Sequence, residues 1–356
     1  MTGNANTFEA AAAAVGELDD GAGRAAAEHH DRLTKPRGSL GRVEAIGVRL
    51  AAITGESPPP VPAPAAVAVF AGDHGVLAEG VTPWPQDVTA QMVQNFVAGG
   101  AAINVLARQT GARVIVVDVG VATELDAAPG LTRQKVRSGT GNIAREPAMT
   151  IAEARQALDV GAAVAARLVD DGAACLVMGD MGIGNTTPSA ALVAAFTGRA
   201  AREVTGRGTG IDDATLARKV AAVDAALART PDRDDPVAVL ASLGGLEIAA
   251  LTGFVVGGAA ARVPVVVDGV IAGAALLTAT KLVPGATHFC FAGHRSTEPA
   301  ARVILDTLGL EPILDLELRL GEGSGACLAL PVLEASARIL GEMATFDAAG
   351  VTDKPD

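Results

Sequence analysis

The sequence predicts an α/β fold in which a mostly parallel sheet has helices on both faces. The first observation is a series of short, continuous apolar runs rich in β-branched residues, found at residues 66–70, 114–119, 175–178 and 264–267, with a weaker candidate at 288–291. Such runs suit strands that are buried on both faces. The second observation is that Ala-rich segments typical of helices alternate with them, at residues 152–168, 214–227 and 269–282. Alternation of strand and helix indicates a parallel sheet whose crossovers are helices.

The first sixty residues differ from this pattern. Residues 1–34 are Ala-rich with scattered charges and predict helix, and residues 43–53 have apolar side chains at helical spacing. The Pro-rich stretch at residues 57–62 then breaks regular structure. We interpret it as a linker that precedes the first strand.

Composition bounds the kind of molecule. A chain of 356 residues can hold one large or two medium domains, and 49% hydrophobic residues supply ample core. The chain has no Tyr and one Trp, so an extended aromatic platform for single-stranded nucleic acid is not expected. A net charge of −12 argues against a general nucleic-acid or anionic-membrane surface, but it leaves room for a local basic pocket that binds one phosphate.

The cysteines and the apolar runs favour a soluble, cytoplasmic protein. Cys175, Cys290 and Cys327 lie far apart in apolar surroundings, as expected of buried reduced thiols. The longest apolar runs, at residues 248–261 and 269–280, are shorter than the roughly 18 residues that a membrane-spanning helix needs. No basic-plus-apolar leader opens the sequence, so we expect no export and no membrane insertion.

Polar residues follow four of the predicted strands at the point where each strand ends. These are Asp73 and His74, then Asp180 with the segment 182–187, then Asp268, and finally His294 and Ser296. In an open parallel sheet, ligands bind at the carboxyl ends of the strands. The concentration of Gly, Asp, His and Ser at four such ends exceeds what turns require and predicts a site there.

The segment after residues 175–178 is the most specific of these ends. Gly182, Gly184, Asn185, Thr186 and Thr187 form a strand-to-helix turn of small and hydroxyl residues. Backbone amides at a helix N-terminus suit a phosphate. The segment lacks the Gly-Lys-Ser/Thr ending of a P-loop and the third glycine of a dinucleotide fingerprint. The alternative is an ordinary helix N-cap by Asn185 or Thr186.

One carboxylate and two cations are further candidates. Glu322 lies in Gly-Glu-Gly-Ser-Gly at residues 321–325, where flanking glycines let the backbone approach a ligand and a pocket can raise the carboxyl pKa toward that of a general base. A solvated turn glutamate is the alternative. Arg207 and Lys219 are candidate phosphate partners, although each taken alone fits a surface cation. The five histidines show no metal-ligand spacing, so no metal is predicted.

Six blocks of the sequence resemble one known family. They cover roughly residues 35–335 in order: Lys-Pro-Arg-Gly-Ser-Leu-Gly at 35–41, Phe-Ala-Gly-Asp-His-Gly-Val at 70–76, the segment 88–104, Gly-Asp-Met-Gly-Ile-Gly-Asn-Thr-Thr at 179–187, Gly-Gly-Leu-Glu-Ile at 244–248 and Leu-Gly-Glu-Gly-Ser-Gly at 320–325. Together they resemble the nicotinate-nucleotide–dimethylbenzimidazole phosphoribosyltransferase (CobT) family of cobalamin lower-ligand (nucleotide loop) biosynthesis.

The resemblance implies an activity and a set of site residues. Nicotinate mononucleotide would give its phosphoribosyl group to 5,6-dimethylbenzimidazole, yielding α-ribazole 5′-phosphate and nicotinate. Glu322 would be the general base and Asp180 a second catalytic carboxylate, although Asp180 stands where many relatives have a Glu that is one methylene longer. The loop 182–187 and Lys219 would hold the phosphate, and Thr82 and Gln91 would lie near the acceptor ring. The substrate-binding set that it implies is Thr82, Gln91, Gly182, Gly184, Asn185, Thr186, Thr187, Lys219, Ser296 and Leu320.

The resemblance also implies an architecture. Residues 61–311 would form a Rossmann-like large domain, and residues 1–60 with 312–356 a small helical domain built from both chain ends. A homodimer is expected, and no cofactor. Two alternatives stay open: a phosphoribosyltransferase for another acceptor, such as a purine or a phenol, and a non-catalytic nucleotide-binding homologue.

Overall fold

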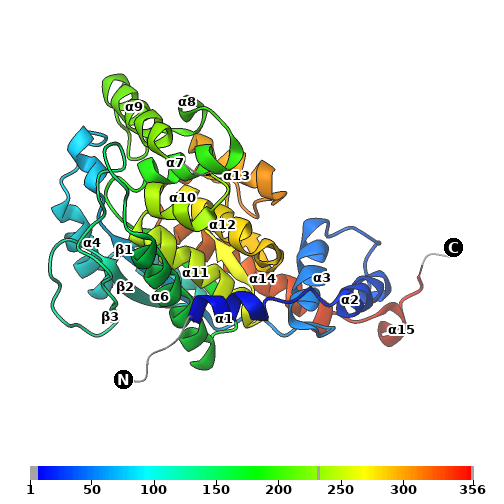
Figure 1. Ribbon diagram of the computed structural model, residues 1–356. Helices are drawn as coiled ribbons and strands as arrows, with labels where there is room; N and C mark the ends of the chain where they lie inside the picture. The colour runs from blue at the N-terminus through cyan, green and yellow to red at the C-terminus, as the bar shows by residue number, and fades with distance from the viewer. Residues whose placement is uncertain (1–6, 231–232, 354–356) are drawn as a thin grey trace.

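A six-stranded parallel sheet forms the centre of the protein, as the sequence predicts (Figure 1). The computed structural model describes residues 7–230 and 233–353. The strands lie in the order β3-β2-β1-β4-β5-β6. Their bounds are β1 (Ala65–Gly72), β2 (Arg113–Gly120), β3 (Leu131–Arg133), β4 (Cys175–Met181), β5 (Val265–Val267) and β6 (Cys290–Ala292).

Helices cover the sheet on both faces, and all eight residues of β1 are therefore buried. The α-helices are α1 (Thr7–Ala14), α2 (Asp20–Arg32), α3 (Arg42–Thr54), α4 (Asp87–Val97), α5 (Ala102–Thr110), α6 (Ile151–Asp170), α7 (Thr186–Thr197), α8 (Ala201–Val204), α9 (Asp213–Arg229), α10 (Pro236–Leu243), α11 (Leu246–Ala260), α12 (Val270–Leu282), α13 (Pro299–Leu308), α14 (Ser324–Glu342) and α15 (Phe346–Ala349). Two 3₁₀ helices are η1 (Gly75–Glu79) and η2 (Pro284–Phe289).

Several predicted elements need correction. The helix expected over residues 1–34 is two helices, because Asp19 caps a new start by accepting the Ala22 amide; residues 1–6 lie outside the described part. The weak strand candidate at 288–291 is displaced, since its first half belongs to η2 and the strand begins at Cys290. The short edge strand β3 was not predicted, because three residues carry too little pattern.

The apolar run at residues 248–261 is the buried helix α11, which packs along α6 and against β1, β2, β4 and β5. Its glycines allow this close packing. A Cβ at Gly253 would lie 2.0 Å from the Leu158 carbonyl oxygen, and one at Gly161 of α6 would lie 1.8 Å from that of Ala250. The two helices therefore meet backbone to backbone, which places small residues where a larger side chain cannot fit.

The chain ends pack in two different places. Helices α2 and α3 pack together with α14 at one side of the molecule, whereas α1 packs on α6 and α11 (Figure 1). Within the described residues α14 is the one helix long and apolar enough to span a membrane, but 56% of its apolar window is buried, which identifies a core helix of a soluble protein. The division into residues 1–60 with 312–356 and residues 61–311 stays a prediction.

The strand order places a switch point between β1 and β4. From β1 the chain continues to β2 on one side, whereas β4 pairs with β1 on the other. The loops that leave these two neighbouring strands therefore turn to opposite sides, which opens a crevice at their carboxyl ends. The polar ends predicted from the sequence meet at this edge.

Candidate active site

A cavity of about 400 Å³ lies at the carboxyl edge of the sheet. Its wall includes ten of the twelve residues predicted for the site: Thr82, Asp180, Gly182, Gly184, Asn185, Thr186, Lys219, Ser296, Leu320 and Glu322. The two others lie elsewhere. Gln91 is exposed on α4 outside the wall, and Thr187 is fully buried behind it. Segments separated by more than two hundred positions thus form one pocket.

One end of the cavity is built for an anion. The segment after β4 leads into the N-terminus of α7, and the positive end of a helix dipole favours an anion. Lys219 of α9 donates from Nζ to Thr186 Oγ1 at 2.7 Å and to the Gly206 carbonyl oxygen at 3.0 Å. Burial lowers the pKa of Lys219 to about 8, so the amine is still mostly charged at neutral pH. The negative charge of a bound phosphate would raise the pKa of Lys219 again.

The Gly-rich segment 206–210 forms the rim of this end. The buried carboxylate of Glu298 accepts the Gly208 amide at 2.8 Å, and Arg319 donates to the Gly208 carbonyl at 2.9 Å. Arg207 lines the cavity, and its guanidinium pairs with Asp213, which lies outside the wall. Sequence reasoning missed Glu298, because its partner lies 90 positions away.

Glu322 lines the cavity and has an unusual backbone conformation. Gly321, Glu322 and Gly323 have φ values of +86°, +65° and +87°, a left-handed run that is costly for the central residue. Oε2 accepts the Ile103 amide, in the first turn of α5, at 3.2 Å. Burial raises the pKa of Glu322, the Ile103 amide opposes that, and nearby Asp268 adds to the rise.

Asp268, at the end of β5, fixes this loop. Its Oδ2 accepts the Gly323 amide at 3.2 Å and its Oδ1 accepts the Ala326 amide at 3.0 Å, which joins the loop to the start of α14. His294 Nε2 lies 3.4 Å from Oδ1. Burial lowers the pKa of His294, but the Asp268 carboxylate, with smaller contributions from the Arg295 backbone and Asp315, raises it overall.

A second carboxylate lies beside the first. Asp180 is buried at the end of β4, and its Oδ2 accepts the Asn185 side-chain amide at 2.9 Å. Its Oδ1 has no hydrogen-bond partner in the described residues. Burial, and then the charge of Asp268, raises the pKa of Asp180 to about 8. Carboxyl groups gathered in this way favour a ligand that brings positive charge.

The remaining wall is apolar. Val88 and Met92 come from one face of α4, and Thr82 precedes that helix. Trp84, the one tryptophan of the chain, and Leu320 line the mouth while 49% and 58% exposed. A pocket whose wall combines apolar side chains, carboxylates and a buried lysine fits a flat ring beside a phosphorylated ligand. Within the described residues, no group of three or more His, Cys, Asp or Glu is arranged to hold a metal.

Comparisons with known proteins agree on one family. A family model described as phosphoribosyltransferase matches residues 15–351. A relative from Salinispora tropica named nicotinate-nucleotide–dimethylbenzimidazole phosphoribosyltransferase is 56% identical, covering 98% of this chain and all of its own; one of the same name from Chloroflexus aurantiacus is 54% identical, covering 96% and 97%. A solved structure of that enzyme from Thermus thermophilus is 48% identical, with a TM-score of 0.91, and covers 95% of this chain and all of its own.

Proposed function

Because this chain belongs to the family of nicotinate-nucleotide–dimethylbenzimidazole phosphoribosyltransferases, we propose that it transfers the phosphoribosyl group of nicotinate mononucleotide to 5,6-dimethylbenzimidazole. The products would be α-ribazole 5′-phosphate and nicotinate, and the reaction would serve cobalamin lower-ligand synthesis. The observation that carries the proposal is that two carboxyl groups of raised pKa, Glu322 and Asp180, line the same cavity as Lys219 and the apolar side chains of α4.

The donor fits the polar half of the cavity. Its 5′-phosphate would lie at the N-terminus of α7, beside Lys219 and the Thr186 hydroxyl. Its nicotinate ring is a pyridinium, and the carboxyl groups of Asp180 and Glu322 would face this cationic part of the molecule. Ser296 lines the same half of the cavity and would contact the mononucleotide.

The acceptor fits the apolar half. A benzimidazole would lie along Val88 and Met92, between Trp84 and Leu320 at the mouth. One ring nitrogen attacks C1′ of the ribose, the bond from C1′ to nicotinate breaks, and its electron pair neutralises the pyridinium nitrogen. The other ring nitrogen loses its proton to the Glu322 carboxylate. A base of raised pKa is suited to this transfer at neutral pH.

The assay that tests the proposal offers nicotinate mononucleotide with a panel of benzimidazoles, purines and phenols and follows products by mass spectrometry. We expect α-ribazole 5′-phosphate and nicotinate in equal amounts, with dimethylbenzimidazole preferred. Product from a purine or phenol alone would support the alternative acceptor class. Binding of the mononucleotide without any product would support the non-catalytic homologue.

Glu322→Gln tests the general base. The amide oxygen can still accept the Ile103 amide, so we expect a folded protein whose turnover is lower by about 10²–10⁴-fold. Glu317→Gln is the matched control, since Glu317 also has a positive φ but is exposed and does not line the cavity. Near-wild-type turnover in Glu322→Gln would remove this residue as the base.

Three further features are proposed on the same basis. We propose a cytoplasmic homodimer, as the family resemblance implies, with a small helical domain drawn from both chain ends. The packing of α2 and α3 with α14 supports that domain, whereas α1 lies on α6 and α11. Sedimentation of the purified protein would give the oligomeric state. Roles for Gln91 and Thr187 in binding stay predictions, and neither lines the cavity of the single chain.

A further inference from the structure

The Asp-His segment after β1 does not line the cavity, yet the phosphate-binding loop is seated on it. A Cβ at Gly182 would lie 2.4 Å from the Gly72 carbonyl oxygen and 3.0 Å from His74 Nε2. His74 in turn is 2.9 Å from Glu247 Oε1, and both side chains are buried. The loop therefore rests directly on the end of β1, with no space between them.

A side chain of α4 binds the same loop at its next residue. Thr89 is fully buried, and its Oγ1 accepts the Ile183 amide at 3.1 Å. Thr89 occupies the face of α4 that meets the sheet, whereas its neighbours Val88 and Met92 line the apolar wall of the cavity. A single residue thus joins the helix of the proposed acceptor wall to the loop of the proposed donor site.

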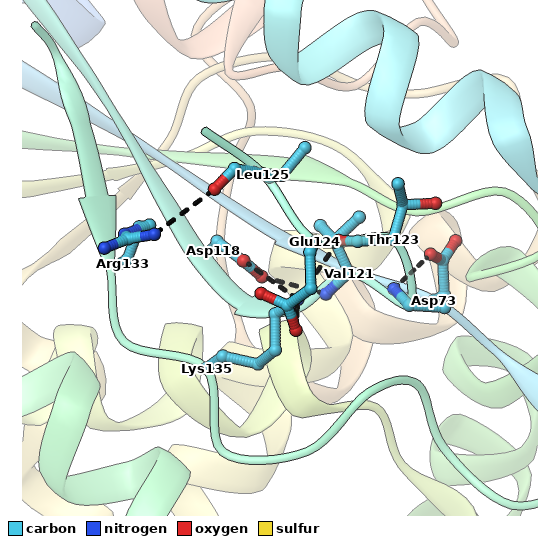
Figure 2. A network of polar contacts seen from close by, with 9 residues as sticks. Asp73, Asp118, Val121, Thr123, Glu124, Leu125, Arg133 and Lys135 are labelled. Atoms are coloured by element: carbon cyan, nitrogen blue, oxygen red, sulfur yellow. Dashed lines mark hydrogen bonds and ion pairs between the residues drawn. The ribbon is translucent and has the colours of Figure 1, made fainter. Parts of the chain in front are cut away.

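Asp73 follows the same end of β1, and its Oδ2 accepts the Ala122 amide at 2.8 Å. Burial raises the pKa of Asp73, and the Ala122 amide and the Thr89 hydroxyl oppose that rise. Figure 2 shows Asp73 beside the loop that leaves β2. That loop is pinned by Asp118, which accepts the Val121 amide at 2.9 Å, and by Lys135, which donates to the Thr123 carbonyl at 3.1 Å.

We propose that Thr89 is a positioning residue that holds the loop 182–184 in register with α4, and so holds the mononucleotide in register with the acceptor. The inference rests on the proposed function. Within the described residues, the other hydrogen bonds of the loop do not connect it to α4. The amides of Asn185 and Thr187 bond within the turn to Gly182 and Gly184, and Asn185 is joined to β4 through Asp180. Loss of the Thr89 bond would therefore shift the loop against α4 without unfolding it.

The test compares Thr89→Val, which has nearly the same shape, with Thr89→Ser, which keeps the hydroxyl. Valine leaves the Ile183 amide without its acceptor, so we expect the KM for nicotinate mononucleotide to rise by about tenfold or more. The KM for dimethylbenzimidazole should change by less than about threefold, and Thr89→Ser should restore the wild-type KM to within about threefold. Thr278→Val is the matched control, because Thr278 is also fully buried but bonds within α12 to Ala274.

Three results would overturn the inference. The first is that Thr89→Val folds and has the same KM for nicotinate mononucleotide as the control Thr278→Val. The second is that Thr89→Ser raises this KM as much as Thr89→Val does. The third applies if Thr89→Val does not fold and is measured by hydrogen exchange of the Ile183 amide in the wild-type protein. We expect this amide to be protected without substrate, and exchange as fast as that of an exposed loop amide would refute the bond. Absence of turnover in the wild type would instead refute the proposed function.

Discussion

Asp180→Asn should stabilise the protein, and should do so more strongly as the pH rises. Burial and the neighbouring Asp268 raise the pKa of Asp180 from 3.8 to about 8 in the folded chain, whereas in the unfolded chain the carboxyl keeps its ordinary value. A raised folded pKa means that the folded protein binds the proton more tightly. The stabilising effect of that proton is therefore complete below about pH 4 and is lost as the pH rises through about 8.

The magnitude follows from the shift. At pH 7 the carboxyl is ionised in the unfolded chain but protonated in the folded chain, so folding takes up one proton. Because pH 7 lies about three units above the pKa of the unfolded chain, this uptake lowers the free energy of unfolding by about 4 kcal/mol, at about 1.4 kcal/mol per unit. An asparagine carries no such cost. Its side-chain oxygen can still accept the Asn185 amide that now bonds Asp180 Oδ2 at 2.9 Å, so the substitution keeps the one contact made there.

Urea unfolding of the wild type and of Asp180→Asn between pH 5 and pH 9 measures the effect. We expect the free energies of unfolding to diverge with rising pH, at up to about 1.4 kcal/mol per unit below pH 8, and to level off above it. Asp224→Asn, at an exposed position of α9, is the control and should run parallel to the wild type. Parallel curves for Asp180→Asn would refute the raised pKa.

Two further predictions concern binding and catalysis. Lys219→Ala should raise the KM for nicotinate mononucleotide by about 10–100-fold, because a charge-assisted contact is lost, and should leave the KM for the acceptor nearly unchanged. Lys281→Ala, at an exposed position, is the control. An equal loss for both substrates, or the same effect in the control, would count against a phosphate role for Lys219. Asp268→Asn removes the charge that raises the pKa of Asp180 and Glu322, so the acid limb of the kcat/KM profile should move to lower pH, and a profile that does not move would contradict this electrostatic role.

What the sequence could predict of the site was local in the chain. Glu322 and the loop 182–187 could be recognised because glycines and helix-start residues lie beside them. The loop 182–187 also follows a predicted strand, and the carboxyl ends of parallel strands meet at one edge of the sheet. The same locality predicted the sheet and its alternating helices. Edge strand β3 and the exact start of β6 could not be found this way, since three-residue strands depend on their pairing partners.

Glu298 and Thr89 were not predicted for the site, and the positioning role of Asp268 was not predicted, because their partners are distant. Glu298 bonds a loop 90 positions away, Asp268 one 55 away, and Thr89 one 94 away. Sequence analysis placed Asp268 in the site only as a polar residue at a strand end. Each of the three acquires its positioning role only when the fold brings two segments together. Gln91 and Thr187 were predicted for the site but do not line the cavity, since a sequence motif does not say which side chain of a helix or turn faces the cavity.

The surroundings of Glu322 act on its pKa in opposite directions. Burial and the charge of Asp268 destabilise the carboxylate, whereas the Ile103 amide at the start of α5 stabilises it. The first two influences strengthen Glu322 as a base, and the third limits the rise of its pKa. The left-handed backbone from Gly321 to Gly323 sets this balance, because it directs the side chain to the α5 amide while Asp268 binds the next amide along. The strain at Glu322 is thus tied to the position in which its pKa is tuned.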